Sequence, residues 1–423
     1  MKKNQRFMKT MQNNQRRILM LLFFSFMVSH FSISQVEEQI PIMAWGGIPP
    51  EESTVERFIE LRESGITHNL SHGYKNADEL AVAMDAAAKA GIKMLVCCPE
   101  LKTETEKTVK RFMNHPAIAG YDLRDEPRRK DFPELGEWVR KIQAIDNKNF
   151  CYVNLLPNQA GKDWWGTDTY LEHVQLFISE VPVPILSFDH YPLILDQAEN
   201  RVIRREWYDN LETFSNEARK AGKPFWAFAL TSAHKNGLTM YYPIPTLAEL
   251  KLQVFSNLAY GAQGIQYFTY WTPMSSRNTF YDFHHGPIDF YSKKRTEIYD
   301  YIKEINSEIK KLSGVFLHAK VVSVAHTGET IPMNTNRLIK LPDIIKTFET
   351  EGTGAIVSVL QKEEKSYLVV VNRDFKNNMK VRIEGESGLL RVLKDGSMVP
   401  ASDYISAMNV APGDILIYCW NNQ

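Results

Sequence analysis

Carboxylates at the end of a short apolar run are the residues of this sequence best placed to do chemistry. Residues 117–127 read A-I-A-G-Y-D-L-R-D-E-P, so the run ends in Asp125, Glu126 and Pro127. A buried strand that ends in acidic residues and a proline places their carboxyl groups at a surface. In a barrel of parallel strands, the carboxyl ends of the strands carry the catalytic groups. We therefore expect Glu126 to be a catalytic acid, with Asp125 as a supporting acceptor. The alternative is a carboxylate that only interacts with a helix dipole.

The elements that must position these groups follow a regular alternation between Pro41 and Ser313. Short apolar runs predict strands at 42–45, 66–70, 93–98, 118–123, 150–155, 185–188, 225–229 and 264–270. Charged helical patterns predict helices at 52–64, 77–90, 104–114, 132–145, 168–180, 205–221, 245–260 and 298–312. Eight strand–helix repeats over this length predict a (β/α)8 TIM barrel, which typically has ~250 residues. A doubly wound sheet is disfavoured because no Gly-rich loop follows the first strand.

The pattern of the sequence changes after Gly314, where β-rich segments replace the alternation of strands and helices. Strands are expected at 315–324, 353–361, 366–372, 379–383, 389–393 and 414–420. We therefore predict an α/β fold in which a barrel over residues 35–314 is followed by a small all-β sandwich over residues 315–423.

Residues 1–34 have the pattern of a secretory signal peptide. A basic, polar segment, Met1–Arg17, precedes the apolar run Ile18–Val28, and Ser32-Ile33-Ser34 is a small-x-small cleavage pattern. The apolar run is short for a membrane span. We expect cleavage near Ser34, a secreted or periplasmic mature protein and no membrane insertion after cleavage. An uncleaved N-terminal anchor is the alternative.

The bulk composition excludes some partners and suggests no cofactor. Lys plus Arg and Asp plus Glu both number 50, so net charge gives no reason to expect nucleic acid or an anionic membrane as a partner. The paired histidines His284 and His285 lack companion ligands at a recognisable spacing. We expect neither a metal nor a cofactor. The cysteines also lack zinc-site spacing and are expected to be buried thiols, although a bridge from Cys97 or Cys98 to Cys151 stays open; they are Cys97, Cys98, Cys151 and Cys419.

The residues that follow the predicted strands form a set rich in aromatic rings and carboxylates. Besides Asp125 and Glu126, the candidates for substrate binding are Trp45, His72, Glu100, Asn154, His190, Tyr191, Tyr270 and Trp271. Cleavage of a glycosidic bond needs one carboxyl group to protonate the leaving oxygen and a second to act as nucleophile or to activate water. Aromatic faces suit sugar rings. Asp189, after the sixth strand, is our candidate for the second carboxylate, so we expect a carbohydrate substrate.

Three short motifs lie in order at the expected strand ends. They are Asp125-Glu126-Pro127 after the fourth strand, Asp189-His190-Tyr191-Pro192 after the sixth and Trp271 after the eighth. The chain resembles the clan A glycoside hydrolases, in which the acid/base Glu follows strand four, usually as Asn-Glu-Pro. The run 258–270 is similar to the eighth strand of the β-galactosidase-like branch. This resemblance implies that Glu126 is the general acid/base, that Asp125 replaces the usual Asn, and that Trp271 forms the floor of a sugar site.

The seventh strand departs from this pattern. The clan places its nucleophilic Glu there, whereas residues 223–231 read K-P-F-W-A-F-A-L-T, and no carboxylate occurs between Glu217 and Glu249. Three explanations stay open. A carboxylate from another strand (Asp189, Glu100 or Asp282) acts with Glu126; the substrate supplies its own nucleophile; or the barrel binds glycans without cleaving them.

Overall fold

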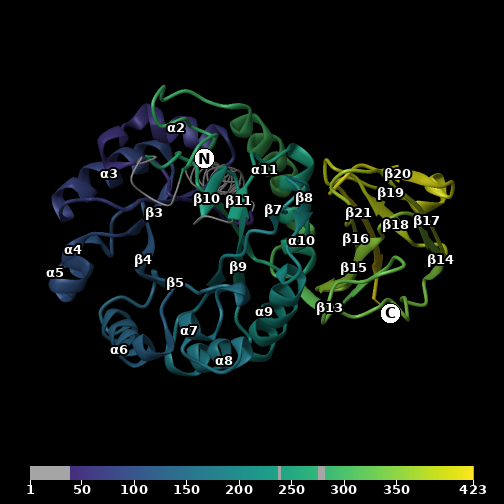
Figure 1. Cartoon of the computed structure of the whole chain (residues 1–423), viewed down its shortest axis with the longest axis horizontal. Helices are drawn as coiled ribbons and strands as arrows, with labels where there is room; N and C mark the ends of the chain where they lie inside the picture. The colour runs from purple at the N-terminus through teal and green to yellow at the C-terminus, as the bar shows by residue number, and fades with distance from the viewer. Residues whose placement is uncertain (1–38, 237–239, 275–281, 423) are drawn as a thin grey trace, which may run out of the picture. The chain divides into compact units, whose positions relative to one another are not determined.

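A computed structural model describes residues 39–236, 240–274 and 282–422 (Figure 1). The predicted signal peptide, residues 1–34, lies outside these ranges. None of the helices in the described ranges is long and apolar enough to cross a membrane.

A ring of parallel strands forms the first part of the chain, as the alternation predicts (Figure 1). Its strands are β1 (Ile42–Trp45), β2 (His68–Leu70), β3 (Lys93–Val96), β4 (Ile118–Asp125), β5 (Phe150–Asn154), β6 (Leu186–Phe188), β9 (Phe225–Leu230) and β12 (Gly264–Phe268). They are hydrogen-bonded in the order β5-β4-β3-β2-β1-β12-β9-β6. A bridge between Leu155 and Phe188 joins β5 to β6 and closes the ring. The predicted TIM barrel is therefore confirmed.

Helices surround the strands and supply the crossover connections. They are α2 (Val55–Glu63), α3 (Ala77–Ala90), α4 (Pro99–Thr103), α5 (Thr105–Phe112), α6 (Phe132–Gln143), α7 (Lys162–Trp165), α8 (Tyr170–Glu180), α9 (Trp207–Ala221), α10 (Leu247–Ala259) and α11 (Glu297–Phe316). Local sequence signals set several helix ends. The side chain of Asn76 accepts hydrogen bonds from two backbone N–H groups at the start of α3. Gly91 ends α3 with a φ of 76°, which costs little in the absence of a Cβ.

Two short hairpins interrupt the simple repeat near the carboxyl ends of the strands. The first joins β7 (Leu193–Leu195) to β8 (Arg201–Ile203), and the second joins β10 (His234–Asn236) to β11 (Met240–Tyr242). The sequence analysis did not predict either hairpin, because each strand has only three residues.

The interior of the barrel is packed rather than open. Met43, Leu70, Leu95, Tyr152 and Trp226 form an apolar cluster inside the ring of strands. The Tyr152 hydroxyl donates a hydrogen bond of 2.6 Å to Gln266 Oε1, so this buried polar group is satisfied. The packed interior leaves the rim formed by the strand ends as the place for a site.

Antiparallel sheets make up the second part of the chain. The larger sheet has the order β13-β15-β16-β21-β18-β19 and the smaller has the order β14-β17-β20. The strands are β13 (Lys320–His326), β14 (Ile345–Thr350), β15 (Ala355–Lys362), β16 (Lys365–Asn372), β17 (Met379–Gly385), β18 (Leu390–Val392), β19 (Met398–Pro400), β20 (Met408–Val410) and β21 (Ile415–Asn421). Side chains from both sheets, including Val370 and Ile383, share one buried cluster. The prediction of a second, all-β part is confirmed.

The strand predicted at 315–324 needs one correction. Val315 and Phe316 belong to α11, and β13 begins only at Lys320. Ile309, Leu312 and Phe316 are buried at helical spacing on one face of α11, so packing of this face extends the helix past the predicted end.

Candidate active site

A pocket of about 320 Å³ lies at the carboxyl ends of the barrel strands. Its lining combines three carboxylates and an amide with a set of rings; the residues are Trp45, Asp125, Glu126, Asn154, Asp189, Tyr191, Phe228, His234, Phe268 and Phe283. A larger hollow of about 880 Å³ runs along α9 and β13, but Glu212 is the one carboxylate among its described lining residues. The smaller pocket is the candidate site because it joins acidic groups to aromatic walls.

The end of β4 holds Glu126 in an uncommon backbone conformation. Its φ is 48°, in the left-handed region that residues other than glycine seldom adopt. The Glu126 N–H donates a hydrogen bond of 2.8 Å to the carbonyl oxygen of Asn154, which continues the pairing of β4 with β5 by one residue. Strained backbone of this kind is often found at functional sites.

Asn154 connects two of the pocket carboxylates. Its side-chain Nδ2 donates hydrogen bonds to Asp125 Oδ1 at 3.1 Å and to Asp189 Oδ1 at 2.9 Å. Its own Oδ1 accepts a hydrogen bond of 2.9 Å from Ser187 Oγ. Only 2% of Asn154 is exposed, so the amide is fixed from both sides and sets the spacing of the acids.

The pocket favours the protonated form of its acids. Although Glu126 is accessible to solvent at the pocket mouth, burial and then the charge of Asp125 raise its pKa to about 7. Burial, followed by the charges of Glu126 and Asp125, raises the pKa of Asp189 well above its usual value. The pKa of Asp125 is also raised, mainly by burial. Close carboxylates with raised pKa values are typical of acid–base sites.

Rings from several strands and loops form the pocket walls. Tyr191 stacks on Phe268 with ring centroids 5.3 Å apart. His234 stacks on Phe283 at 4.7 Å, and burial lowers the pKa of His234 to about 4, so this imidazole is neutral. The Trp45 ring lies 5.3 Å from Phe268. Apolar rings beside fixed acids suit a ring-shaped ligand that carries hydroxyl groups.

Several residues that the sequence analysis placed at the site are not among the described residues that line this pocket. His72 lies beside it, with its ring 4.9 Å from Trp45. Glu100 belongs to α4, after β3. His190 is buried and hydrogen-bonded to Asn210 Oδ1 at 3.1 Å, and burial lowers its pKa to about 3.

Tyr270 and Trp271, predicted as substrate-binding residues, are not among the described residues that line this pocket. Tyr270 is fully buried, with its ring 6.4 Å from Tyr299 of α11. The Trp271 ring lies 5.2 Å from the guanidinium of Arg57 and 5.3 Å from the ammonium of Lys293, outside the pocket lining. β12 ends at Phe268, earlier than predicted, and Phe268 occupies the pocket wall instead.

Four lining rings were missed by the sequence analysis: Phe228, His234, Phe268 and Phe283. Phe228 and Phe268 lie within strands, whereas the candidates were chosen mainly from the ends of the strands and the loops that follow. Alternation along a strand could have found them, because every second residue of a barrel strand points inward.

Strand β9 contributes Phe228 to the pocket, and no residue of β9 is acidic. Its register is fixed on both sides, since Ala229 pairs with Tyr267 and Ala227 pairs with Phe188. Among the described lining residues, the carboxylates come from the end of β4 and from the residue after β6.

Comparison with known proteins agrees with this arrangement. The family model Glyco_hydro_42, described as beta-galactosidase, matches residues 163–312. A crystal structure of a β-galactosidase from Bacillus circulans sp. alkalophilus has a TM-score of 0.59 at 9% identity, and the match covers 90% of this chain and 99% of that one. The chain has a barrel fold similar to that of these clan A glycoside hydrolases.

Other glycoside hydrolase structures share the fold of this barrel protein. A family 5 glycoside hydrolase from Bacteroides vulgatus has a TM-score of 0.55 at 12% identity, with 90% of this chain and 89% of that chain covered. The β-galactosidase of Marinomonas ef1 gives 0.46 at 12% identity, with 65% of this chain covered, and the chain spans 60% of that protein's length. No curated protein matches the sequence significantly.

Proposed function

We propose that this chain is a secreted glycoside hydrolase that cleaves an oligo- or polysaccharide, with Glu126 as the general acid and base. One observation carries the proposal: Glu126 and Asp189 line the same pocket, and the charge of Glu126 contributes to the raised pKa of Asp189. The family match and the glycoside hydrolase fold support the reaction class.

The hydrogen bonds favour Glu126 as the holder of the proton. Two neighbouring acids that repel each other do not ionise together readily, so near neutral pH the pair retains a proton. Burial raises the pKa of Asp189 well above its usual value, and the hydrogen bond that Asn154 donates to Asp189 Oδ1 opposes this shift by favouring the ionised form. Glu126 then keeps the proton and gives it to the glycosidic oxygen as the bond to the sugar breaks.

Asp189 is the proposed second carboxylate. Its negative charge stabilises the positive charge that develops on the sugar carbon. An inverting enzyme would use it to take a proton from the attacking water, and a retaining enzyme would use it as the nucleophile. Proton NMR of the first-formed anomer separates these two courses.

A glycan-binding barrel without turnover is the second candidate. The binding role is favoured by the seventh barrel strand, β9. In the clan this strand carries the nucleophilic Glu, whereas here its residue in the pocket lining is the apolar Phe228. A panel of aryl glycosides and oligosaccharides, assayed with wild type, Glu126→Gln and Asp189→Asn, separates the two candidates. Turnover by wild type that both substitutions abolish supports the hydrolase. Specific glycan binding by all three proteins without turnover supports the binding protein.

Secretion rests on the N-terminal sequence alone. We expect the mature protein to begin near Gln35. N-terminal sequencing of the protein expressed with its full leader tests this, and an intact Met1 end on exported protein would favour the uncleaved anchor.

A further inference from the structure

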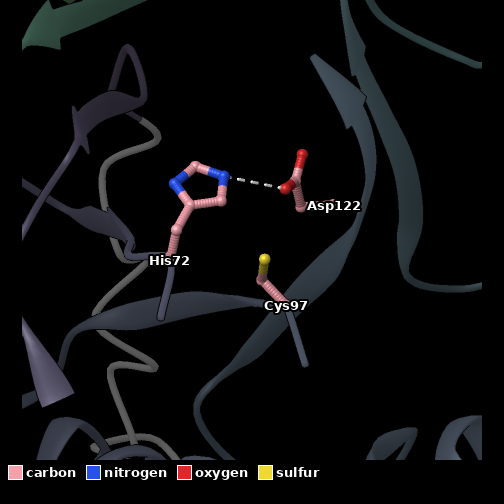
Figure 2. A group of neighbouring side chains, drawn as sticks. All are labelled: His72, Cys97 and Asp122. Carbon is pink, nitrogen blue, oxygen red and sulfur yellow. Dashed lines mark hydrogen bonds and ion pairs between the residues drawn. The ribbon is translucent and has the colours of Figure 1, made fainter. Parts of the chain in front are cut away.

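A second group of chemically reactive side chains lies beside the pocket and has no part in the proposed reaction. His72 follows β2, Cys97 follows β3 and Asp122 lies within β4, so three consecutive strands supply one residue each. Figure 2 shows the three side chains turned towards one another. No metal was expected from the sequence, because His284 and His285 lack companion ligands and the cysteines lack zinc-site spacing.

The donor atoms are close enough for one ion. His72 Nε2, a carboxylate oxygen of Asp122 and the Cys97 sulfur all lie within 4.8 Å of one another, and His72 Nε2 is 3.2 Å from Asp122 Oδ2. Tetrahedral zinc has bonds of ~2.0–2.3 Å to nitrogen, oxygen and sulfur, which places its donors ~3.3–3.8 Å apart. Small rotamer shifts of these three side chains would reach that geometry.

The mixture of donors selects a class of ion. A thiolate, an imidazole and a carboxylate together suit zinc and its neighbours in the transition series, whereas magnesium and calcium prefer oxygen donors alone. The Asp122 side chain is only 8% exposed, while the His72 side chain is 42% exposed. The cluster is thus anchored in the barrel and open to solvent on the His72 side, where water could take a fourth position.

The same three side chains have another arrangement without an ion. His72 Nε2 and Asp122 Oδ2 are then joined by a hydrogen bond of 3.2 Å, and the Cys97 thiol lies beside this pair. Metal binding would replace the protons held by His72 and Cys97 with one divalent ion. The alternative to a metal site is therefore a hydrogen-bonded pair with a neighbouring thiol that only ties three strands together.

We propose that His72, Cys97 and Asp122 form a three-residue site for a divalent transition-metal ion of the zinc type, with the fourth position open to solvent. The site lies next to the substrate pocket, because the His72 ring is 4.9 Å from the Trp45 ring that lines it. It does not depend on the proposed hydrolase function, since none of the three residues lines the pocket.

Cobalt(II) added to the mature protein under reducing conditions tests the site, because a thiolate ligand gives an intense near-ultraviolet charge-transfer band. We expect one equivalent of cobalt to produce this band and zinc to displace it. Cys97→Ser should abolish the band. His72→Gln should retain a band but weaken the affinity by at least ~10–100-fold, the range seen when even an outer-shell partner of a metal ligand is lost.

Two variants provide matched controls. Cys98→Ser removes the neighbouring thiol, which interacts with Glu100 rather than Asp122. His115→Gln removes a histidine that is 3.2 Å from Asp85, a pair with the same spacing but outside any such cluster of the described residues. Both should leave cobalt binding unchanged.

The proposal is overturned if wild type gives no charge-transfer band at one equivalent of cobalt. It is also overturned if the band survives in Cys97→Ser or is lost in Cys98→Ser. If Cys97→Ser does not fold, His72→Gln decides the matter, because the His72 side chain is 42% exposed. Unchanged cobalt affinity in that variant contradicts the site.

Discussion

Replacing Glu126 with Gln should stabilise the folded protein at alkaline pH and leave its stability at about pH 4 unchanged. The pocket raises the pKa of Glu126 from 4.5 to about 7. A carboxyl group whose pKa is higher in the folded state binds its proton more tightly there. Stability is therefore lost as the pH rises through the interval between the two values. The amide of Gln stays neutral and escapes this loss.

The size of the effect follows from the shift and from the exposure of the side chain. A rise of about 2.5 in pKa corresponds to at most ~3.4 kcal/mol. Glu126 is accessible at the pocket mouth, so solvent screening reduces this to about 1–2 kcal/mol. For a chain of this size we expect the melting temperature of Glu126→Gln to exceed that of wild type by roughly 1–2 °C.

Thermal unfolding followed by circular dichroism at several values between about pH 4 and about pH 8.5 measures this difference without any substrate. Glu137→Gln is the matched control, because Glu137 is an exposed carboxylate of α6 outside the pocket lining. A gain that is equal at both pH extremes, or that Glu137→Gln reproduces, would refute the claim that the pocket penalises the charge on Glu126.

The remaining predictions concern turnover. Asn154→Ala removes hydrogen bonds to two carboxylates, so we expect kcat/KM to fall by ~10–100-fold and the acidic limb of its pH profile to move upward by about one pH unit. Asn306→Ala is the control, because the Asn306 amide is equally buried and donates to the Ser64 carbonyl oxygen. This variant should lower the stability of the protein without shifting the pH profile of kcat/KM. Trp45→Ala should raise KM by ~2–10-fold through loss of a pocket ring, whereas Trp271→Phe, outside the lining, should leave KM within about twofold in steady-state assays.

The barrel was predictable because each of its strands and helices has a pattern in its own local sequence. Apolar runs of a few residues, helical patterns between them and a glycine such as Gly91 at a helix end identify the repeats without knowledge of distant contacts. The end of α11 was not predictable in this way. Val315 and Phe316 suit a strand equally well, and only their burial on the inner face of the helix decides between the two.

The residues of the candidate site were predictable where reactive side chains lie directly after a strand. This rule found Glu126, Asp189 and Tyr191, and Asn154 was found as the last residue of β5; all four line the pocket. The rule failed at the end of β12. The predicted strand ends at Tyr270, whereas the observed strand ends two residues earlier, at Phe268. The sequence does not reveal such boundaries, because hydrogen bonds to β1 and β9 decide where the strand stops.

The dependence of turnover on the leaving group tests the role of Glu126 most directly. Aryl glycosides of one sugar, with phenols of different acidity, would be hydrolysed by wild type and by Glu126→Gln. If Glu126 protonates the leaving oxygen, the substitution should cost ~100–10,000-fold in kcat/KM for the least acidic phenol and much less for the most acidic one, which leaves without a proton. An equal loss for every phenol, or no loss at all, would contradict the assignment of Glu126 as the general acid.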